Sequence, residues 1–361
     1  MKYIANISLL GILTFILGLI IIPIIKNIAI QFNLVDKPNY RKIHANPVPL
    51  VGGISIVIVF LPMLMLSGNF IFVFSKYLPI LTAAILLLIV GVIDDKHDIN
   101  AKYKLIIQLI LAAIVALSGT RITSFFGFLG YNEINIYIQY FITIIVITGV
   151  VNAFNLMDGV DGLVGSLSFV GFAMFLIAAI YYKDKELMTV SMLIMGALLS
   201  FLRFNLSRKH KIFMGDSGSL FLGFILVSLG INLLEKENLA EQHTYAYPFL
   251  ILVAFFSIPV LDSIRVYLGR IKNGDSPFKA DKSHLHHILL SIGLTHKRIS
   301  LFVILMCLGL FFAGFGLTSY FSTTIVVLFL IALFFIILRF LLMLSSLKYW
   351  KKTLKQMEEE E

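Results

Sequence analysis

The chain has 361 residues, of which 59% are hydrophobic and only 14% are charged. Soluble domains carry roughly 45–50% apolar and about 25% charged residues. The composition therefore excludes disordered, collagen-like and coiled-coil proteins. It also excludes an ordinary soluble enzyme, because the cores of such a protein could not bury this many apolar side chains. The formal net charge of +9 would suit nucleic acid, but the basic residues are scattered between apolar runs, a pattern typical of membrane topology.

A bilayer core about 30 Å thick needs about 20 apolar residues in a helix. We therefore expect an all-α, polytopic integral membrane protein with about eleven transmembrane helices. The first segment has only Lys2 before it and is too long for a signal-peptide core, so we expect it to be retained. A single transmembrane catalytic domain should cover residues 1–346, followed by a charged cytoplasmic tail over 347–361. The expected spans are residues 3–25, 50–66, 77–93, 105–119, 136–151, 163–181, 188–202, 217–234, 246–264, 299–318 and 322–344.

Basic residues in the loops orient this chain in the membrane. Loops on one side hold 22 of the 29 Lys and Arg residues, and loops on the other side hold 6. Because cytoplasmic loops carry the excess of Lys and Arg, the N-terminus should lie outside and the C-terminus in the cytoplasm. The polar clusters described next all fall on the expected cytoplasmic side.

Two adjacent carboxylates, Asp94 and Asp95, end the third expected span in GVIDDKHDINAKYK. Negative charge at a helix C-terminus meets an unfavourable dipole, so a cation, a proton or a function should compensate. The simpler interpretation is that these side chains at the end of the helix extend into the surrounding water. The functional one is a general base plus a charge that orients a metal-bound phosphate, with Lys102 and Lys104 near enough to hold that phosphate.

Asn152, Asn155, Asp158 and Asp161 are spaced by three residues in NAFNLMDGVDG. On a helix, residues i and i+3 lie on one face, and the two glycines of the motif let the backbone turn or approach a ligand. Carboxylate and amide oxygens suit a hard cation, which beside phosphate is usually Mg²⁺. Helix capping by Asn and Asp is the alternative.

Asp216 begins the eighth expected span in FMGDSGSLFLGF. It could serve as a simple helix cap. An Asp at a helix start beside glycines also fits a metal or pyrophosphate site, because free backbone N–H groups point there. The four basic residues before it indicate by themselves only a cytoplasmic loop.

Four histidines, His284, His286, His287 and His296, lie in HLHHILLSIGLTHKR. Their spacing is not the H-x-x-x-H of catalytic zinc sites, and the single cysteine, Cys307, excludes a disulfide or a Cys-based metal site. We expect these histidines to donate hydrogen bonds to a diphosphate. The first cytoplasmic loop adds Arg41, Lys42 and His44 to the candidates for substrate binding.

Five motifs together carry a resemblance to a known family: RKIHANPVPLVGG, GVIDDKHDINAKYK, NAFNLMDGVDG, FMGDSGSLFLGF and HLHHIL. They resemble the motifs of the polyprenyl-phosphate N-acetylhexosamine-1-phosphate transferases, and they occur in order between residues 36 and 296. The related pentapeptide translocase has a lysine before a P-T-M-G-G stretch. This chain has H-A-N-P-V-P-L-V-G-G there, which favours the bacterial undecaprenyl-phosphate GlcNAc-1-phosphate transferase branch.

The resemblance implies a reaction. A polyprenyl phosphate attacks the β-phosphorus of a UDP-N-acetylhexosamine, and the products are the polyprenyl-diphospho-sugar and UMP. Mg²⁺ is the implied cofactor, with Mn²⁺ as a substitute. The implied partners are the UDP-sugar, the lipid phosphate and the bilayer, without nucleic acid, and a homodimer is compatible with them. The site should face the cytoplasm from the inner membrane, and the product should start a cell-envelope glycan.

The resemblance also assigns roles to residues. The catalytic group consists of Asp94, Asp95 and Lys104, with Lys104 holding the lipid phosphate. The metal ligands are Asn155, Asp216 and Asp158. Phe213 packs on uracil and Asp161 reads the uridine. The remaining expected substrate-binding residues are Asn205, His284, His286, His287, Arg41, Lys42 and His44.

Two other classes of function stay open at this point. A secondary transporter or lipid flippase would place ionisable residues near the bilayer midplane, often in repeated halves. Asp262, Arg265 and Arg339 are its only candidates, and the sequence has no visible repeat. A non-catalytic scaffold would leave the clustered acids and histidines unexplained.

Overall fold

The computed structural model describes residues 2–36, 47–238, 247–276 and 282–360. Nearly all of this part is helical, which confirms the all-α prediction, and two short strands pair antiparallel between the first two helices. The helices are α1 (Lys2–Gln31), α2 (Gly52–Leu66), α3 (Phe70–His97), α4 (Ala101–Leu117), α5 (Ile136–Met157), α6 (Leu163–Tyr181), α7 (Lys185–Asn205), α8 (Gly215–Asn238), α9 (Tyr247–Lys272), α10 (Leu285–Ser291), α11 (His296–Thr318) and α12 (Thr323–Glu360), with β1 (Val35–Asp36), β2 (Val48–Pro49) and the 3₁₀ turn η1 (Phe128–Gly130).

Several helices are long and apolar enough to cross a bilayer. Within the described residues nine of them meet this standard, which makes the protein a multi-pass membrane protein. The other two expected spans correspond to α2, with 15 residues, and α4, with 17 residues. Both are shorter than the roughly 20 residues that a perpendicular span needs, so the count of eleven stays a prediction.

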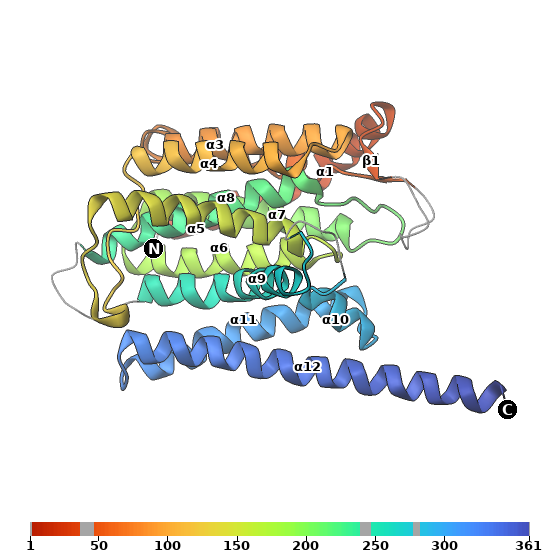
Figure 1. Ribbon diagram of the computed structural model, residues 1–361. Helices are drawn as coiled ribbons and strands as arrows, with labels where there is room; N and C mark the ends of the chain where they lie inside the picture. Colours follow the sequence, from red (N-terminus) through yellow and green to blue (C-terminus); the bar gives the residue numbers. More distant parts are fainter. Residues whose placement is uncertain (1, 37–46, 239–246, 277–281, 361) are drawn as a thin grey trace.

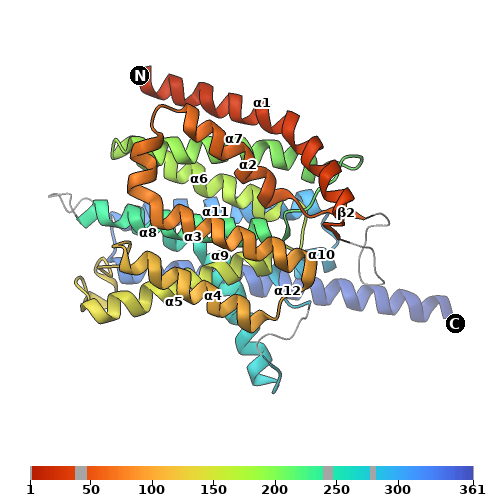
Figure 2. The same ribbon diagram turned by 90° about the horizontal axis from the view of Figure 1, so that it is seen from above.

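The long helices run side by side in one bundle around α8 (Figure 1). Helices α2, α3, α5, α6 and α9 contact α8, and α8 is the most completely buried of the long helices. The chain begins at one end of the bundle, and α12 ends beyond the opposite end (Figures 1 and 2). The two described ends of the chain therefore lie at opposite ends of the bundle.

Several helices extend past the predicted spans, among them α3, α5 and α12. Helix α3 starts at Phe70 rather than at residue 77, with a kink at Tyr77 just before Pro79, because proline lacks the N–H that continues the ladder. Helix α12 continues to Glu360 through Lys, Gln and Glu residues, which form helices well but carry no apolar signal. Helix α5 continues to Met157.

Close backbone contacts fix the start of α8 against α2 and α3. A Cβ placed on Gly53 would lie 2.5 Å from the Gly218 Cα, and one on Gly91 would lie 2.3 Å from the Ser217 Cα. A side chain at either glycine would collide with the α8 backbone, so these positions allow three helices to meet closely. Asp216 lies within this contact, and its backbone is held firmly as a result.

Candidate active site

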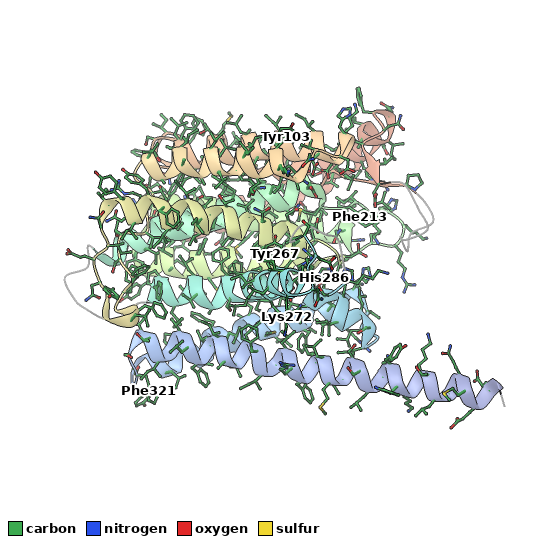
Figure 3. All side chains as sticks on the ribbon, in the orientation of Figure 1. Tyr103, Phe213, Tyr267, Lys272, His286 and Phe321 are labelled. Carbon is green, nitrogen blue, oxygen red and sulfur yellow. The ribbon has the colours of Figure 1, made fainter. Side chains whose placement is uncertain are left out.

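The expected site residues that the structure describes gather at one end of the bundle. They come from the C-terminal ends of α3 and α5, the N-terminal ends of α4 and α8, the loops 158–162 and 206–214, and α10. Figure 3 shows Phe213 and His286 at this end, and Phe321 at the other. Arg41, Lys42 and His44 lie outside the described residues.

Asp95 binds the N-terminus of α8. Its carboxylate accepts hydrogen bonds from the backbone N–H groups of Asp216, at 2.8 Å, and Ser217, at 3.2 Å. Gly215, which precedes them, has φ +73°, a left-handed conformation that glycine adopts without strain. The first N–H groups of a helix have no partner within the helix, so Asp95 acts as a cap supplied by another helix and positions Asp216.

Lys104 joins the two other carboxylates of this end. Its Nζ lies 2.5 Å from Asp94 Oδ2 and 3.0 Å from Asp216 Oδ2. The second oxygen of Asp94 accepts the backbone N–H of Ile99 at 2.7 Å, just after α3 ends. The sequence predicted that α4 returns its lysine to the acidic pair, and the structure brings Lys104 to that position.

Asn155 approaches Asp216 from α5. Its Nδ2 donates to Ser219 Oγ at 3.1 Å, and its side chain also lies within hydrogen-bonding range of the Asp216 carboxylate. Asn152, one turn earlier, points elsewhere and donates to Gln108 Oε1 of α4 at 2.7 Å. Because α5 ends at Met157, the four polar residues of this motif do not share one helical face.

Asp158 follows directly after α5 and makes no side-chain hydrogen bond to the described residues. Burial raises its pKa well above the usual range, and the carboxylates of Asp216, Asp95 and Asp161 raise it further. A buried carboxylate whose pKa is raised by neighbouring carboxylates needs a cation beside it if it is to stay ionised.

Oxygen ligands from Asp216, Asp158 and Asn155 therefore fit a hard cation such as Mg²⁺. Within the described part of the chain, no group of three or more His, Cys, Asp or Glu side chains lies close enough to hold a metal. The set expected from the sequence is a mixed one of two carboxylates and one amide, and it stays a prediction.

Asp161 connects three separate elements. Its Oδ2 accepts from Lys211 Nζ at 2.7 Å and lies 2.7 Å from His296 Nδ1 of α11. Burial opposes ionisation of Asp161, but the hydrogen bonds of His296 and Lys211 outweigh it, so its pKa lies below the usual range. Lys211 Nζ also lies 5.0 Å from the centre of the half-buried Phe213 ring, and this contact places a carboxylate, a cation and an aromatic face together.

Phe213 is held through its backbone. Its N–H donates to Pro49 O at 2.8 Å, and its carbonyl accepts the N–H of Gly52 at 2.9 Å. Asn205, expected to bind substrate, is buried; its Oδ1 accepts from Gly162 N at 2.6 Å and its Nδ2 donates to Ile212 O at 2.8 Å. In this structure Asn205 joins the two loops that carry Asp161 and Phe213, and its expected role stays a prediction.

The histidine motif rests on α9 through Asp262. This carboxylate is 1% exposed and lies 3.0 Å from His284 Nδ1, 2.6 Å from Arg265 Nη2 and 3.0 Å from the backbone N of Leu285. Arg265 also donates to Ser283 O at 2.6 Å. The sequence offered Asp262 and Arg265 only as transporter candidates; their place at this end of α9 shows instead that they hold the start of α10.

His286 is buried against the loop that follows α5. A Cβ on Gly159 would lie 2.4 Å from His286 Nε2, so only glycine allows this approach. Burial lowers the pKa of His286 to about 3, and the neighbouring His287 and His284 add to the effect; the ring is neutral at pH 7. The His284 and His286 rings stack with their centres 5.9 Å apart, and the His287 ring lies tilted against His286 at 4.2 Å.

Four residues that contact the expected site residues were not identified as site residues from the sequence. Lys211 and His296 were seen as part of basic and histidine-rich segments, without a partner, and Asp262 and Arg265 were assigned to another class. A signal exists for the last pair: an acid and an arginine three residues apart near the end of a span are expensive in a membrane unless they are paired.

The fold and the site define a multi-pass membrane protein with one acidic, lysine-bearing site at one end of its bundle. The sequence profile of glycosyl transferase family 4 matches residues 77–234. The probable undecaprenyl-phosphate N-acetylglucosaminyl 1-phosphate transferase of Bacillus subtilis is 31% identical over 287 residues, 79% of this chain and 77% of that protein.

Two further relatives are as similar over most of their length. The undecaprenyl-phosphate alpha-N-acetylglucosaminyl 1-phosphate transferase of Salmonella typhi is 32% identical over 313 residues, 85% of this chain and 82% of that protein. The protein of the same name from Pasteurella multocida is 36% identical over 304 residues, 81% of each chain. The chain therefore belongs to glycosyl transferase family 4, together with these transferases, as the motifs of the sequence indicated.

Proposed function

We propose that this protein transfers N-acetylglucosamine 1-phosphate from UDP-N-acetylglucosamine to undecaprenyl phosphate and releases UMP. The names of its relatives supply the sugar phosphate and the lipid. The single observation that carries the proposal is the arrangement of Lys104, Asp94 and Asp216, which combines a cation for a lipid phosphate with carboxylates for a metal-bound diphosphate.

The donor would bind between Phe213 and the Asp158–Asp216 pair. The half-buried ring of Phe213 can stack on uracil, and Asp161, held by Lys211 and His296, can accept a hydrogen bond from the uracil N–H. Asn155, Asp158 and Asp216 would hold Mg²⁺, which offsets the charge of the diphosphate and of the departing UMP. The diphosphate would then lie beside the histidines of α10.

The acceptor would present its phosphate to Lys104. In the direct reaction one phosphate oxygen attacks the β-phosphorus, the bond from that phosphorus to UMP breaks, and UMP leaves with the electron pair. The lipid phosphate has a second pKa near 6, so it is mostly a dianion at pH 7 and needs little help from a base. Asp94 is the better candidate for this base because it contacts Lys104. Asp95 already accepts a backbone hydrogen bond from the start of α8.

We further propose that the site faces the cytoplasm from the inner membrane, with the N-terminus outside and the C-terminus inside. The 22-to-6 distribution of basic residues supports this orientation, and the opposite positions of the two chain ends agree with an odd number of crossings. The product would begin a cell-envelope glycan, since a UDP-sugar is cytosolic and the acceptor is a membrane lipid.

The test uses purified protein in detergent with undecaprenyl phosphate, Mg²⁺ and a panel of UDP-sugars. Release of UMP that depends on lipid, on metal and on the N-acetylglucosamine donor supports the proposal. A stoichiometric burst of UMP without lipid, with sugar phosphate retained on the protein, would replace direct attack by a covalent relay. No UMP under any condition, despite intact folding, would reject the activity.

A further inference from the structure

Two amide side chains join α4 to α5 about one helical turn away from the site. Asn152 Nδ2 of α5 donates to Gln108 Oε1 of α4 at 2.7 Å and to Thr148 O of its own helix at 2.9 Å. Gln108 is 2% exposed. The reaction proposed above uses neither of the two amides. We call Gln108 and Asn152 the amide pair and ask what their bond does.

The amide pair interrupts the apolar side of α4. The other four buried residues of this helix are aliphatic: Leu111, Ala112, Val115 and Ala116. Aliphatic contacts alone select a helix register poorly in a bilayer, because lipid tails are as apolar as the side chains. A buried amide must be bonded, and its bond has a fixed length and direction. The amide pair therefore selects one placement of α4 on α5, as a single buried Asn does in a coiled coil.

Each member of the amide pair is close to a site residue of its own helix. Gln108 follows Lys104 by four residues, and Asn152 precedes Asn155 by three, spacings at which side chains are neighbours on a helix. These separations correspond to about 6 Å along α4 and about 4.5 Å along α5. Because α4 begins and α5 ends at the site, the bond holds Lys104 and Asn155 at nearly the same depth in the bundle.

Of the two helices, α5 is the one fixed to the centre of the bundle. A Cβ on Gly223 of α8 would lie 2.9 Å from Phe154 Cβ, so α5 packs on α8 at close range. Helix α4 packs chiefly on α3 and α5. Beyond its first turn, the exposed side chains of α4 are Ile106, Leu109, Ile110, Ile114 and Leu117. This outward face is apolar, so α4 is a peripheral helix whose placement depends on its contacts with α3 and α5.

Other contacts at the start of α4 do not replace the amide pair. Lys104 is paired with Asp94 and Asp216, but these ion pairs must be exchanged for substrate contacts when Lys104 takes a phosphate. The connection over residues 98–100 keeps the start of α4 near the end of α3. A connection at one end does not fix the rotation of a helix about its axis, and successive residues differ in direction by about 100°.

We propose that Gln108, through its bond to Asn152, is a positioning residue that directs Lys104 toward the phosphate of the lipid acceptor. The substrate named here rests on the proposed function, whereas the placement of α4 by the amide pair does not. The residues proposed to bind the nucleotide, Phe213 and Asp161, lie on other elements. Loss of the bond should therefore affect the acceptor more than the donor.

Steady-state kinetics test this difference between the two substrates. Gln108→Leu removes the bond, and Leu111→Ala is the matched control, because it removes packing on the same side of α4 without removing a directed bond. In UMP release, Gln108→Leu should raise the KM for undecaprenyl phosphate about tenfold or more and the KM for the UDP-sugar less than about twofold, since an error of about 1 Å in positioning can cost ~10²-fold. Leu111→Ala should lower the Tm without separating the two KM values. An equal change in both KM values of Gln108→Leu, no change in either, or the same separation in Leu111→Ala would overturn the proposal.

An exchange of the two amides tests whether the bond itself is responsible. Gln108→Asn shortens the reach from α4 by one methylene group, and Asn152→Gln lengthens the reach from α5 by the same amount. Each single variant should raise the KM for undecaprenyl phosphate, and the double variant should regain most of the loss because the bond can form again. A double variant no better than the single ones would contradict a role for the bond.

A distance measurement gives a readout that does not depend on activity. Tyr103 of α4 is 65% exposed and Leu199 of α7 is 43% exposed, so spin labels on Tyr103→Cys and Leu199→Cys report the position of α4, and the native Cys307 is buried. Gln108→Leu should shift or broaden the distribution of distances between the labels. The double amide variant should restore the distribution, and Leu111→Ala should leave it unchanged.

An unchanged distribution in Gln108→Leu would overturn the positioning role, whatever happens to activity. If the unchanged protein releases no UMP, the proposed function fails, and the distance between the labels still decides whether the amide pair places α4.

Discussion

The cap that Asp95 provides to α8 leads to a prediction that separates structural from chemical roles within the acidic pair. We consider Asp95→Asn, which keeps the volume of the side chain and removes its charge. The carboxylate accepts two backbone N–H groups, at 2.8 and 3.2 Å. An asparagine has one accepting oxygen, so one of these two donors would face an amide N–H₂ group instead.

The loss can be estimated from these two contacts. A hydrogen bond to a charged group contributes about 1.5–3 kcal/mol, and the remaining bond would become a weaker, neutral one. We expect Asp95→Asn to lower the free energy of unfolding by about 2–3 kcal/mol, which begins at the upper end of measured N-cap substitutions, about 2 kcal/mol. At about 2 °C per kcal/mol, the value for large domains, the Tm should fall by about 4–6 °C.

Cys307 makes the assay straightforward. It is buried and is the only cysteine, so a maleimide dye that fluoresces on reaction with a thiol reports unfolding in detergent. Asp98→Asn is the matched control, because it makes the same chemical change three residues away at an exposed helix end, where Asp98 has φ +53° and asparagine is tolerated. We expect the control to leave the Tm unchanged.

The outcome also bears on catalysis. If Asp95 acts through α8, activity and Tm should fall together in Asp95→Asn, because Asp216 would no longer be held in place. An unchanged Tm combined with lost activity would refute this reasoning, and would show that Asp95 acts on the substrate directly.

Four further predictions concern other parts of the molecule. Asp216→Asn should weaken Mg²⁺ binding and turnover together, and near-normal activity at low Mg²⁺ would contradict its role as a ligand. Because the pKa of Asp161 is lowered, its ion pairs should stabilise the protein above pH ~4 and lose this effect as the pH falls. As the pH is lowered, the Tm of Asp161→Asn should therefore fall less than the Tm of the unchanged protein. Asp262→Asn should reduce kcat/KM about tenfold or more in UMP release, since an error of about 1 Å in positioning can cost ~10²-fold, and normal kinetics would show that it does not position the histidines. Lys185→Cys should react with a membrane-impermeant label from outside intact cells and Ser207→Cys should not, and the reverse pattern would invert the topology.

Much of the fold could be predicted because lipid imposes a simple rule on sequence. Stretches of about 20 apolar residues must be helices in a bilayer, and the eleven expected spans each coincide with a helix of the structure. The rule fails at helix ends. It could not find the polar continuation of α12, the seven-residue helix α10 or the start of α3 at Phe70, because these segments are decided by helix propensity and local contacts rather than by apolar length.

The site shows a similar division. Asp94, Lys104, Asn155 and Asp216 could be brought together from sequence, since each lies at a span end on the same side. Sequence could not show how Asp94 differs from Asp95, because neighbouring residues of a helix point in directions about 100° apart and only the packing of α3 on α8 decides which one caps α8. Bonds such as that of Asp161 to His296, 135 residues away, need a tertiary structure.

The two sides of the site are held in place by different kinds of contact. On the side of α2, α3 and α8, backbones interlock through Gly53 and Gly91 with no room for a side chain. On the side of α9, the histidine segment is held by Asp262 and Arg265 through side-chain hydrogen bonds rather than through interlocked backbones. The side formed by α2, α3 and α8 should therefore move little when a substrate binds. Any closure around a substrate, and any tolerance for a differently shaped sugar, should come from the histidine side, and this is where changes of donor specificity should be sought.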